Sequence, residues 1–115
     1  MNPLDGAWRI RAYIKDGVGT PIEGVLLFAG GWWALYCVLL RPGGDWTSAE
    51  TGPYDMDGAA LRLHHRFKFQ GTAGGPGTTA RDMTHVEACT FTVEGETLSI
   101  TFASGNLLAL ERLRD

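Results

Sequence analysis

The sequence predicts an all-β fold, a small antiparallel up-and-down β-barrel of about eight strands that residues 1–115 form as a single domain. Sixteen glycines punctuate the chain at short intervals, so no window allows a helical period to run for several turns. Between them lie short runs that alternate apolar and polar residues or are apolar throughout, which is typical of strands. Sequential hairpins close into a barrel more naturally than a Greek key does, although a two-sheet sandwich fits the strand count nearly as well.

The N-terminal half of the chain begins with an alternating strand over residues 8–15, whose even-numbered side chains from Trp8 to Ile14 share one face. The segments that follow are a loop over 16–24, strands over 25–29 and 32–40 joined by Gly30 and Gly31, and a loop over 41–53 that carries Trp46. The two strands of this hairpin are apolar on both faces, so its outer surface is also expected to be covered.

Two adjacent histidines mark the next hairpin. Asp57 and Gly58 suit a type I′ turn between a short strand over 54–56 and a strand over 61–69. In the second strand the odd-numbered residues are apolar apart from one histidine, and the even-numbered residues are basic. His65 is therefore expected to face the core and His64 to face solvent.

The C-terminal half is predicted to contain three more strands. Residues 71–80 lack side chains that can pack and are predicted to form a mobile loop. In the strand predicted over 81–93, the odd-numbered residues, which include His85 and Glu87, are assigned to the inner face because Phe91 and Val93 belong to that set. Strands over 97–102 and 107–114 complete the chain.

Both ends of the chain carry residues that resemble the bacterial lipocalin-like (calycin-type) family of small β-barrels. Gly6, Ala7 and Trp8 resemble the Gly-x-Trp signature that opens the first strand of lipocalins, and Arg112 resembles the arginine of the closing strand that packs across that tryptophan. The resemblance extends loosely over most of the chain. It implies that the indole fills the base of the barrel beneath the guanidinium group, and that one small ligand can bind inside.

Composition excludes several classes of function. The net charge of −3 argues against nucleic acid or an anionic membrane as a partner. The first residues lack the features of a signal peptide and no apolar run approaches a membrane span, so a soluble, cytoplasmic protein is expected. Cys37 and Cys89 are too few for a disulfide framework or a zinc knuckle and are expected to be buried. No spacing specifies a metal site or a phosphate-binding loop, so we expect no metal and no cofactor.

Three polar side chains are expected to converge inside the barrel. Glu87 and His85 are two residues apart on one strand, so their side chains should emerge on the same face about 7 Å apart, with His65 on a neighbouring strand. A carboxylate beside imidazoles in a low-dielectric pocket can tune a general acid or base. The alternative is a structural role for each group, and a bulge between Thr84 and Ala88 would expose the pair.

The favoured function is binding of a small, largely apolar molecule in the barrel. The residues expected to line the ligand site are His65, His85, Glu87, Phe67, Phe69, Met83, Phe91 and Tyr36. The runner-up is a cyclase, isomerase or dehydratase acting on a polyketide- or terpenoid-like substrate, with His85, Glu87 and His65 as catalytic residues. A third hypothesis is an interaction module with a packed interior. An outward tryptophan beside Leu35, Cys37 and Leu39 would favour a homodimer through the strand from Trp32 to Leu40, unless another segment covers that face.

Overall fold

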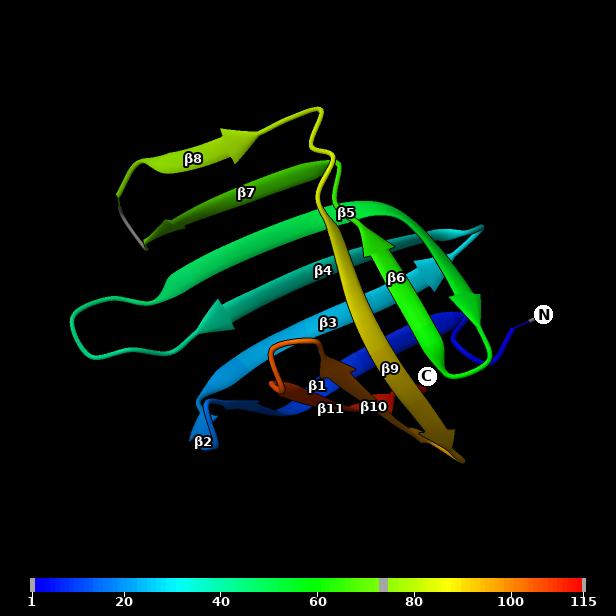
Figure 1. The fold of residues 1–115 in the computed structure, drawn as a ribbon. Coiled ribbons are helices and arrows are strands. Elements are labelled where there is room, and N and C mark those ends of the chain that lie inside the picture. Colours follow the sequence, from blue (N-terminus) through cyan, green and yellow to red (C-terminus); the bar gives the residue numbers. More distant parts are fainter. Residues whose placement is uncertain (1, 73–74, 115) are drawn as a thin grey trace.

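The computed structural model describes residues 2–72 and 75–114, in which eleven strands and no helix occur (Figure 1). The strands are β1 (Gly6–Lys15), β2 (Val18–Thr20), β3 (Ile22–Ala29), β4 (Trp32–Leu39), β5 (Trp46–Asp57), β6 (Ala60–His64), β7 (Phe67–Thr72), β8 (Gly77–Ala80), β9 (Val86–Glu94), β10 (Thr97–Phe102) and β11 (Leu107–Arg112). In this part of the chain nothing has the length and apolarity of a membrane-spanning helix.

Eight of these strands form a closed antiparallel barrel. The order β1-β3-β4-β5-β6-β9-β10-β11 places each strand beside its predecessor, and β11 pairs with β1 to complete the ring. The predicted up-and-down barrel is therefore confirmed, and its closure is consistent with a lipocalin-like fold. The remaining strands are additions: β2 pairs with β1, and the β7–β8 hairpin extends from β5 (Figure 1).

Strand β5 changes partner half-way along its length. Its first half, Trp46 to Thr51, pairs with β7, whereas its second half, Tyr54 to Asp57, pairs with β6. Gly52 lies at the change of partner, where a Cβ atom would overlap the carbonyl oxygen of His64. A glycine is needed here because the two backbones approach more closely than any side chain permits.

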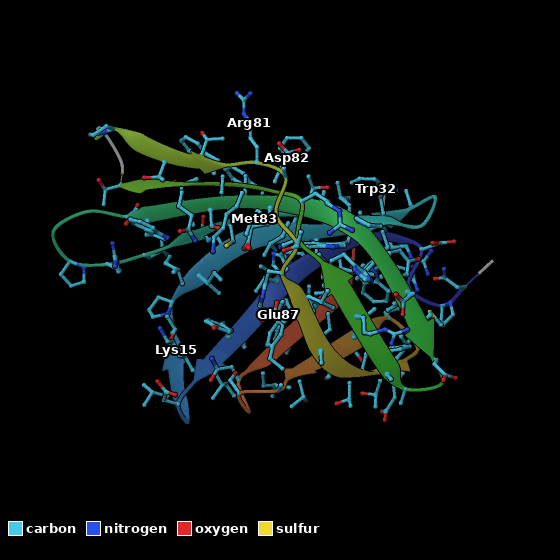
Figure 2. All side chains as sticks on the ribbon, turned by 45° about the horizontal axis from the view of Figure 1, so that its top comes forward. Lys15, Trp32, Arg81, Asp82, Met83 and Glu87 are labelled. Carbon is cyan, nitrogen blue, oxygen red and sulfur yellow. The ribbon has the colours of Figure 1, made fainter. Side chains whose placement is uncertain are left out.

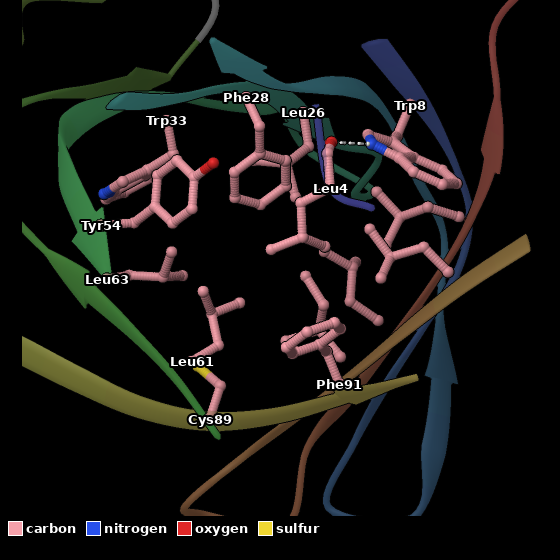
Figure 3. Close-up of a cluster of buried hydrophobic side chains, with 14 of the residues drawn as sticks. Leu4, Trp8, Leu26, Phe28, Trp33, Tyr54, Leu61, Leu63, Cys89 and Phe91 are labelled. Atoms are coloured by element: carbon pink, nitrogen blue, oxygen red, sulfur yellow. Dashed lines mark hydrogen bonds between the residues drawn. The ribbon is translucent and has the colours of Figure 1, made fainter. Parts of the chain in front are cut away.

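One end of the barrel is closed by a hydrophobic core and by the N-terminal segment (Figure 3). Trp8 and Leu4 are completely buried, and the indole nitrogen of Trp8 donates to the carbonyl oxygen of Leu4 at 2.8 Å. The guanidinium carbon of Arg112 lies 4.1 Å from the centre of the Trp8 ring, and its nitrogens donate to the carbonyl oxygens of Asp5 and Pro3. The stacking expected from the sequence is thus present and joins the first strand to the last.

Three predictions for the N-terminal half were wrong. Residues 16–24, predicted as a loop, contain all of β2 and the beginning of β3. Residues 46–53, predicted as part of a loop, form the first part of β5, and Trp46 begins that strand. In β1 a bulge between Ile10 and Ala12 shifts the register, so half-buried Tyr13 packs against the core while Ala12 is exposed. A bulge inserts one residue, and the side chains beyond it change faces.

The tryptophan pair of β4 is split between the two faces, as expected, but its neighbours differ from the prediction. Trp33 points inward and is 2% exposed, whereas Trp32 points outward and is 48% exposed. Leu35, Cys37 and Leu39 share the inner face with Trp33 and line the interior, so they do not flank the outward tryptophan. The 71–80 segment was also predicted as a loop; its described parts include the end of β7 and all of β8, and residues 73–74 lie outside the described chain.

Candidate functional site

A cavity of about 340 Å³ lies inside the barrel, beyond the hydrophobic core. Its apolar lining includes Ile10, Tyr13, Ile22, Leu26, Trp33, Leu35, Leu39, Ile100, Phe102 and Leu108. Its polar lining includes Ser48, Glu50, His65, Lys68, Gln70, His85 and Glu87. The interior is therefore neither solidly packed nor uniformly apolar, and its volume lies near the lower limit of typical small-molecule sites.

The backbone around His65 leaves the regular ladder where β6 ends and β7 begins. The amide of His65 donates to the carbonyl oxygen of His85 at 2.8 Å, and the amide of Arg66 donates to that of Thr51 at 3.0 Å. The indole nitrogen of Trp33 donates to the carbonyl oxygen of His64 at 3.2 Å. Together these bonds tie the short crossover to β4, to β5 and to the segment that precedes β9, and they fix the direction of the His65 side chain, which is 7% exposed.

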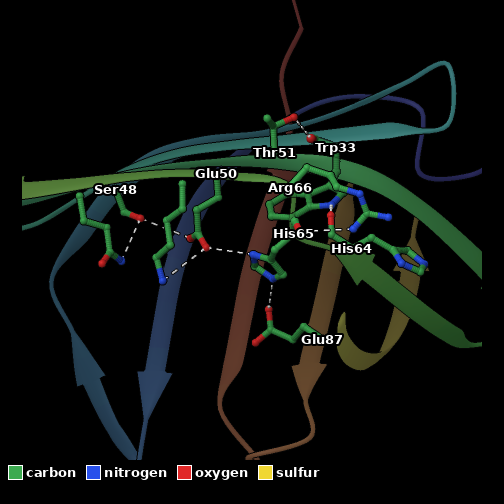
Figure 4. A network of polar contacts seen from close by, with 10 residues as sticks. Trp33, Ser48, Glu50, Thr51, His64, His65, Arg66 and Glu87 are labelled. Carbon is green, nitrogen blue, oxygen red and sulfur yellow. Dashed lines mark hydrogen bonds and ion pairs between the residues drawn. The ribbon is translucent and has the colours of Figure 1, made fainter. Parts of the chain in front are cut away.

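His65 lies between two carboxylates (Figure 4). Its Nδ1 is 3.2 Å from Oε1 of Glu50, and its Nε2 is 3.3 Å from Oε1 of Glu87. Nζ of Lys68 lies 3.9 Å from the same Glu50 oxygen, and the Ser48 hydroxyl donates to Glu50 Oε2 at 3.3 Å. The result is a continuous polar network across one wall of the cavity.

The network favours the charged forms of His65 and Glu50. Burial alone would lower the pKa of His65, but hydrogen bonds and charges from Glu50 and Glu87 outweigh it and raise this pKa to about 9. Burial alone would raise the pKa of Glu50, but the hydrogen bond from His65 and the positive charge of Lys68 hold it below its usual range. At neutral pH His65 is therefore an imidazolium ion between two carboxylates.

The three polar residues expected to converge do so, but to different depths. His65 is buried, Glu87 is half-buried, and His85 is exposed while still lining the cavity. The rings of His65 and His85 are 5.0 Å apart. Met83, in the segment between β8 and β9, also lines the cavity, and Figure 2 shows the chain running down from Met83 to Glu87.

Three of the expected lining residues point away from the cavity. Phe67, Phe69 and Tyr36 are 50%, 44% and 56% exposed, and all three line a groove on the outer surface. For the two phenylalanines the reason is the crossover at His65 and Arg66, which reverses the alternation and turns Lys68 and Gln70 inward. Tyr36 lies on the face of β4 opposite Trp33 and Cys37. Phe91 is buried in the core as expected, but it does not line the cavity.

Glu50 lines the cavity and contacts His65, and the sequence analysis did not include it among the candidate site residues. Its strand was predicted as a loop because the face it presents to the interior is mostly polar: Ser48 and Glu50 follow Trp46 at a spacing of two. That spacing, together with the threonines on the alternate positions, is the signal that could have revealed a strand. Hydrophobic periodicity cannot detect a strand whose inward-facing residues are polar and form hydrogen bonds with one another.

Within residues 2–72 and 75–114, no group of three or more His, Cys, Asp or Glu side chains is arranged to hold a metal ion. Neither the models of known protein families nor the curated proteins yield a match to this chain.

Proposed function

We propose that this protein binds a small, largely apolar molecule in its barrel, as lipocalin-like proteins do. The observation that carries the proposal is the combination of a largely apolar cavity of about 340 Å³ with the Glu50–His65–Glu87 network on one wall, in which His65 is buried. Apolar walls supply most of the binding free energy, and a few placed polar groups orient the ligand. The cost of burying this network is a reason to expect a use for it.

Binding can be tested with 1-aminoanthracene, whose fluorescence increases in apolar surroundings. Leu39 lines the cavity, whereas its neighbour Leu40 is 37% exposed and does not. Leu39→Trp should fill part of the cavity and weaken binding at least tenfold, while Leu40→Trp should bind as the wild type does. If the probe does not bind, or if the two variants behave alike, the interior cavity is not the binding site.

An acid–base enzyme is the second candidate, a cyclase, isomerase or dehydratase for polyketide- or terpenoid-like substrates. It is favoured by the imidazolium group of His65, which holds the carboxylate of Glu87 at the edge of an apolar cavity, an arrangement suited to proton transfer. A pH-dependent turnover that is lost in Glu87→Gln and kept in Glu94→Gln would support it, since Glu94 is exposed at the far end of the same strand. Probe binding without turnover of any such substrate supports the carrier.

We also propose that a second copy of the chain covers the outer face of β3, β4, β5 and β7. Leu27, Trp32, Tyr36, Phe67 and Phe69 are each 44–56% exposed on it. Aromatic side chains of this kind each expose roughly 100 Å², so the four rings alone supply about half of the ~800 Å² that one partner gives to a standard interface. Sedimentation should show a dimer that Tyr36→Lys dissociates; a wild type that stays monomeric at all concentrations contradicts this.

A cytoplasmic location is part of the same proposal. Both cysteines are buried free thiols, as expected from the sequence, and a reducing compartment keeps such thiols unpaired.

A further inference from the structure

The polar groups on the cavity wall leave His65 no free nitrogen with which to bind a ligand. Its two ring nitrogens are both engaged by carboxylates, at 3.2 Å from Glu50 and 3.3 Å from Glu87. An imidazolium ion has only these two donors and no acceptor. A ligand in the cavity would therefore have to break an existing ion pair to bond to His65.

Glu50 is similarly occupied. Its Oε1 faces both His65 and Lys68, and its Oε2 accepts the hydroxyl of Ser48. The Ser48 hydroxyl in turn accepts a hydrogen bond from Gln70 at 3.5 Å. Both oxygens of Glu50 therefore have partners within the network. This end is also more deeply buried than the Glu87 end, since the Glu50 side chain is only 14% exposed.

Glu87 is the exception. One of its oxygens faces His65, and the other has no hydrogen-bond partner among the residues that the structure describes. The side chain is 35% exposed and lines the cavity, so a ligand inside the barrel can reach this carboxylate. An ionised carboxylate accepts hydrogen bonds and cannot donate them, so the complementary group on a ligand is a donor.

The charges of the network already balance. The imidazolium of His65 and the ammonium of Lys68 offset the carboxylates of Glu50 and Glu87. An ionised ligand would bring an uncompensated charge into a partly desolvated site, which is costly. A neutral ligand avoids that cost while still offering a donor to Glu87.

We propose that the ligand is a neutral, mostly apolar molecule carrying a hydroxyl group that donates to the free oxygen of Glu87, with His65 as a positioning residue that orients this carboxylate. The inference rests on the proposed binding function and narrows it to one chemical class. It replaces the expectation that His65 itself anchors the ligand.

The test compares three probes that share a naphthalene body: 2-naphthylmethanol, its methyl ether and naphthalene-2-carboxylate. Each is titrated as a competitor of 1-aminoanthracene. The alcohol and the ether are neutral at every working pH, and only the alcohol donates a hydrogen bond. Because a hydrogen bond to a charged group is stronger than one between neutral groups, the alcohol should bind about tenfold more tightly than the ether. The carboxylate should bind more weakly than both.

Variants assign the preference to Glu87. In Glu87→Leu the ratio of ether to alcohol dissociation constants should fall to about one, whereas Glu94→Leu on the same strand should keep it near ten. Glu87→Gln retains an acceptor without charge and should give an intermediate ratio, which covers the case in which the leucine variant does not fold. His65→Gln should lower the ratio by weakening the alcohol more than the ether. A purely structural defect would instead weaken both probes equally and leave the ratio near ten.

The outcomes separate the two proposals. If the alcohol and the ether displace 1-aminoanthracene equally well from the wild type, or the carboxylate binds most tightly, the hydroxyl assignment is overturned and the binding function stands. If 1-aminoanthracene itself does not bind, the binding function is overturned and the assignment falls with it.

Discussion

Raising the pH from 6 to 9 should destabilise this protein, because folded His65 retains a proton that the unfolded chain releases. An unperturbed histidine, as in the unfolded chain, has a pKa of 6.5, whereas the pKa of His65 in the fold is raised to about 9. Between these values the folded state binds more protons than the unfolded state, so the free energy of unfolding falls as pH rises. The stabilisation is fully present below pH 6.5 and is lost as the pH passes through about 9.

The magnitude follows from the same difference in pKa. Each pKa unit corresponds to about 1.4 kcal/mol, so His65 should contribute about 3 kcal/mol at pH 6. Glu50 and the two buried thiols act outside this window. Glu50, whose pKa is lowered, stabilises the fold above its ordinary pKa of 4.5 and ceases to do so on acidification. The buried thiols of Cys37 and Cys89 have pKa values raised from 9.0 to about 11 and about 12, so their contribution is lost only above pH 9.

Urea denaturation followed by tryptophan fluorescence at pH 6, 7, 8 and 9 measures this effect. The variant His65→Gln removes the proton-binding group, so its stability should change little over the same range. Glu50→Gln removes one carboxylate partner and should give an intermediate slope, with a lower pKa for His65 in an NMR titration. A wild-type free energy of unfolding that is constant to within about 0.5 kcal/mol, or a slope that survives in His65→Gln, would refute the reasoning.

Three further predictions concern the frame of the barrel. Gly52→Ala should cost about 3 kcal/mol of stability, because the added Cβ would overlap the backbone of His64. Gly19→Ala should be close to neutral in the same denaturation experiment, because a Cβ at Gly19 would have nothing within 4 Å. Equal effects of the two substitutions would contradict the close approach at Gly52. Arg112→Ala removes the contact with Trp8 and two hydrogen bonds and should cost about 1–3 kcal/mol of stability. Arg11→Ala should cost at most about 0.5 kcal/mol, because the Arg11 side chain is 54% exposed in its ion pair with Glu111. A smaller loss of stability in Arg112→Ala than in Arg11→Ala would count against the role of Arg112 in closing the barrel. Cys37 and Cys89 should resist iodoacetamide at pH 8 in the folded protein and react in denaturant, as mass spectrometry can show; rapid labelling of the native protein would show that the thiols are accessible.

Much of the barrel could be predicted because its walls alternate regularly over several strands. In β9 and β10 the buried residues, such as Phe91 and Leu98, fall where a period of two puts them. His65 and Glu87 could be placed inside for the same reason. The stacking of Arg112 on Trp8 was also expected, since the resemblance of both chain ends pointed to it.

The candidate site could be predicted only in part. The alternation from Leu61 to Phe69 looks unbroken in the sequence, because Phe67 and Phe69 are apolar and Lys68 is charged. The structure places the two phenylalanines outside and Lys68 inside, since the chain crosses from β6 to β7 at His65 and Arg66. The alternation of apolar and polar residues does not reveal such a crossover when the inward residues after it, such as Lys68, are polar and contact other polar groups inside the barrel.

The sequence by itself predicted an antiparallel barrel and the inward direction of His65, and the resemblance of its two ends to lipocalin-like barrels predicted the contact between Trp8 and Arg112. Tertiary structure alone decided that Glu50 meets His65, because Glu50 lies on β5, whose partner changes at Gly52 from β7 to β6, and His65 lies in the crossover between those two partners. Period-two alternation is a property of neighbours in the chain and can be read from it. The charge of His65 depends on carboxylates brought from two other strands, and only folding places them within hydrogen-bonding distance.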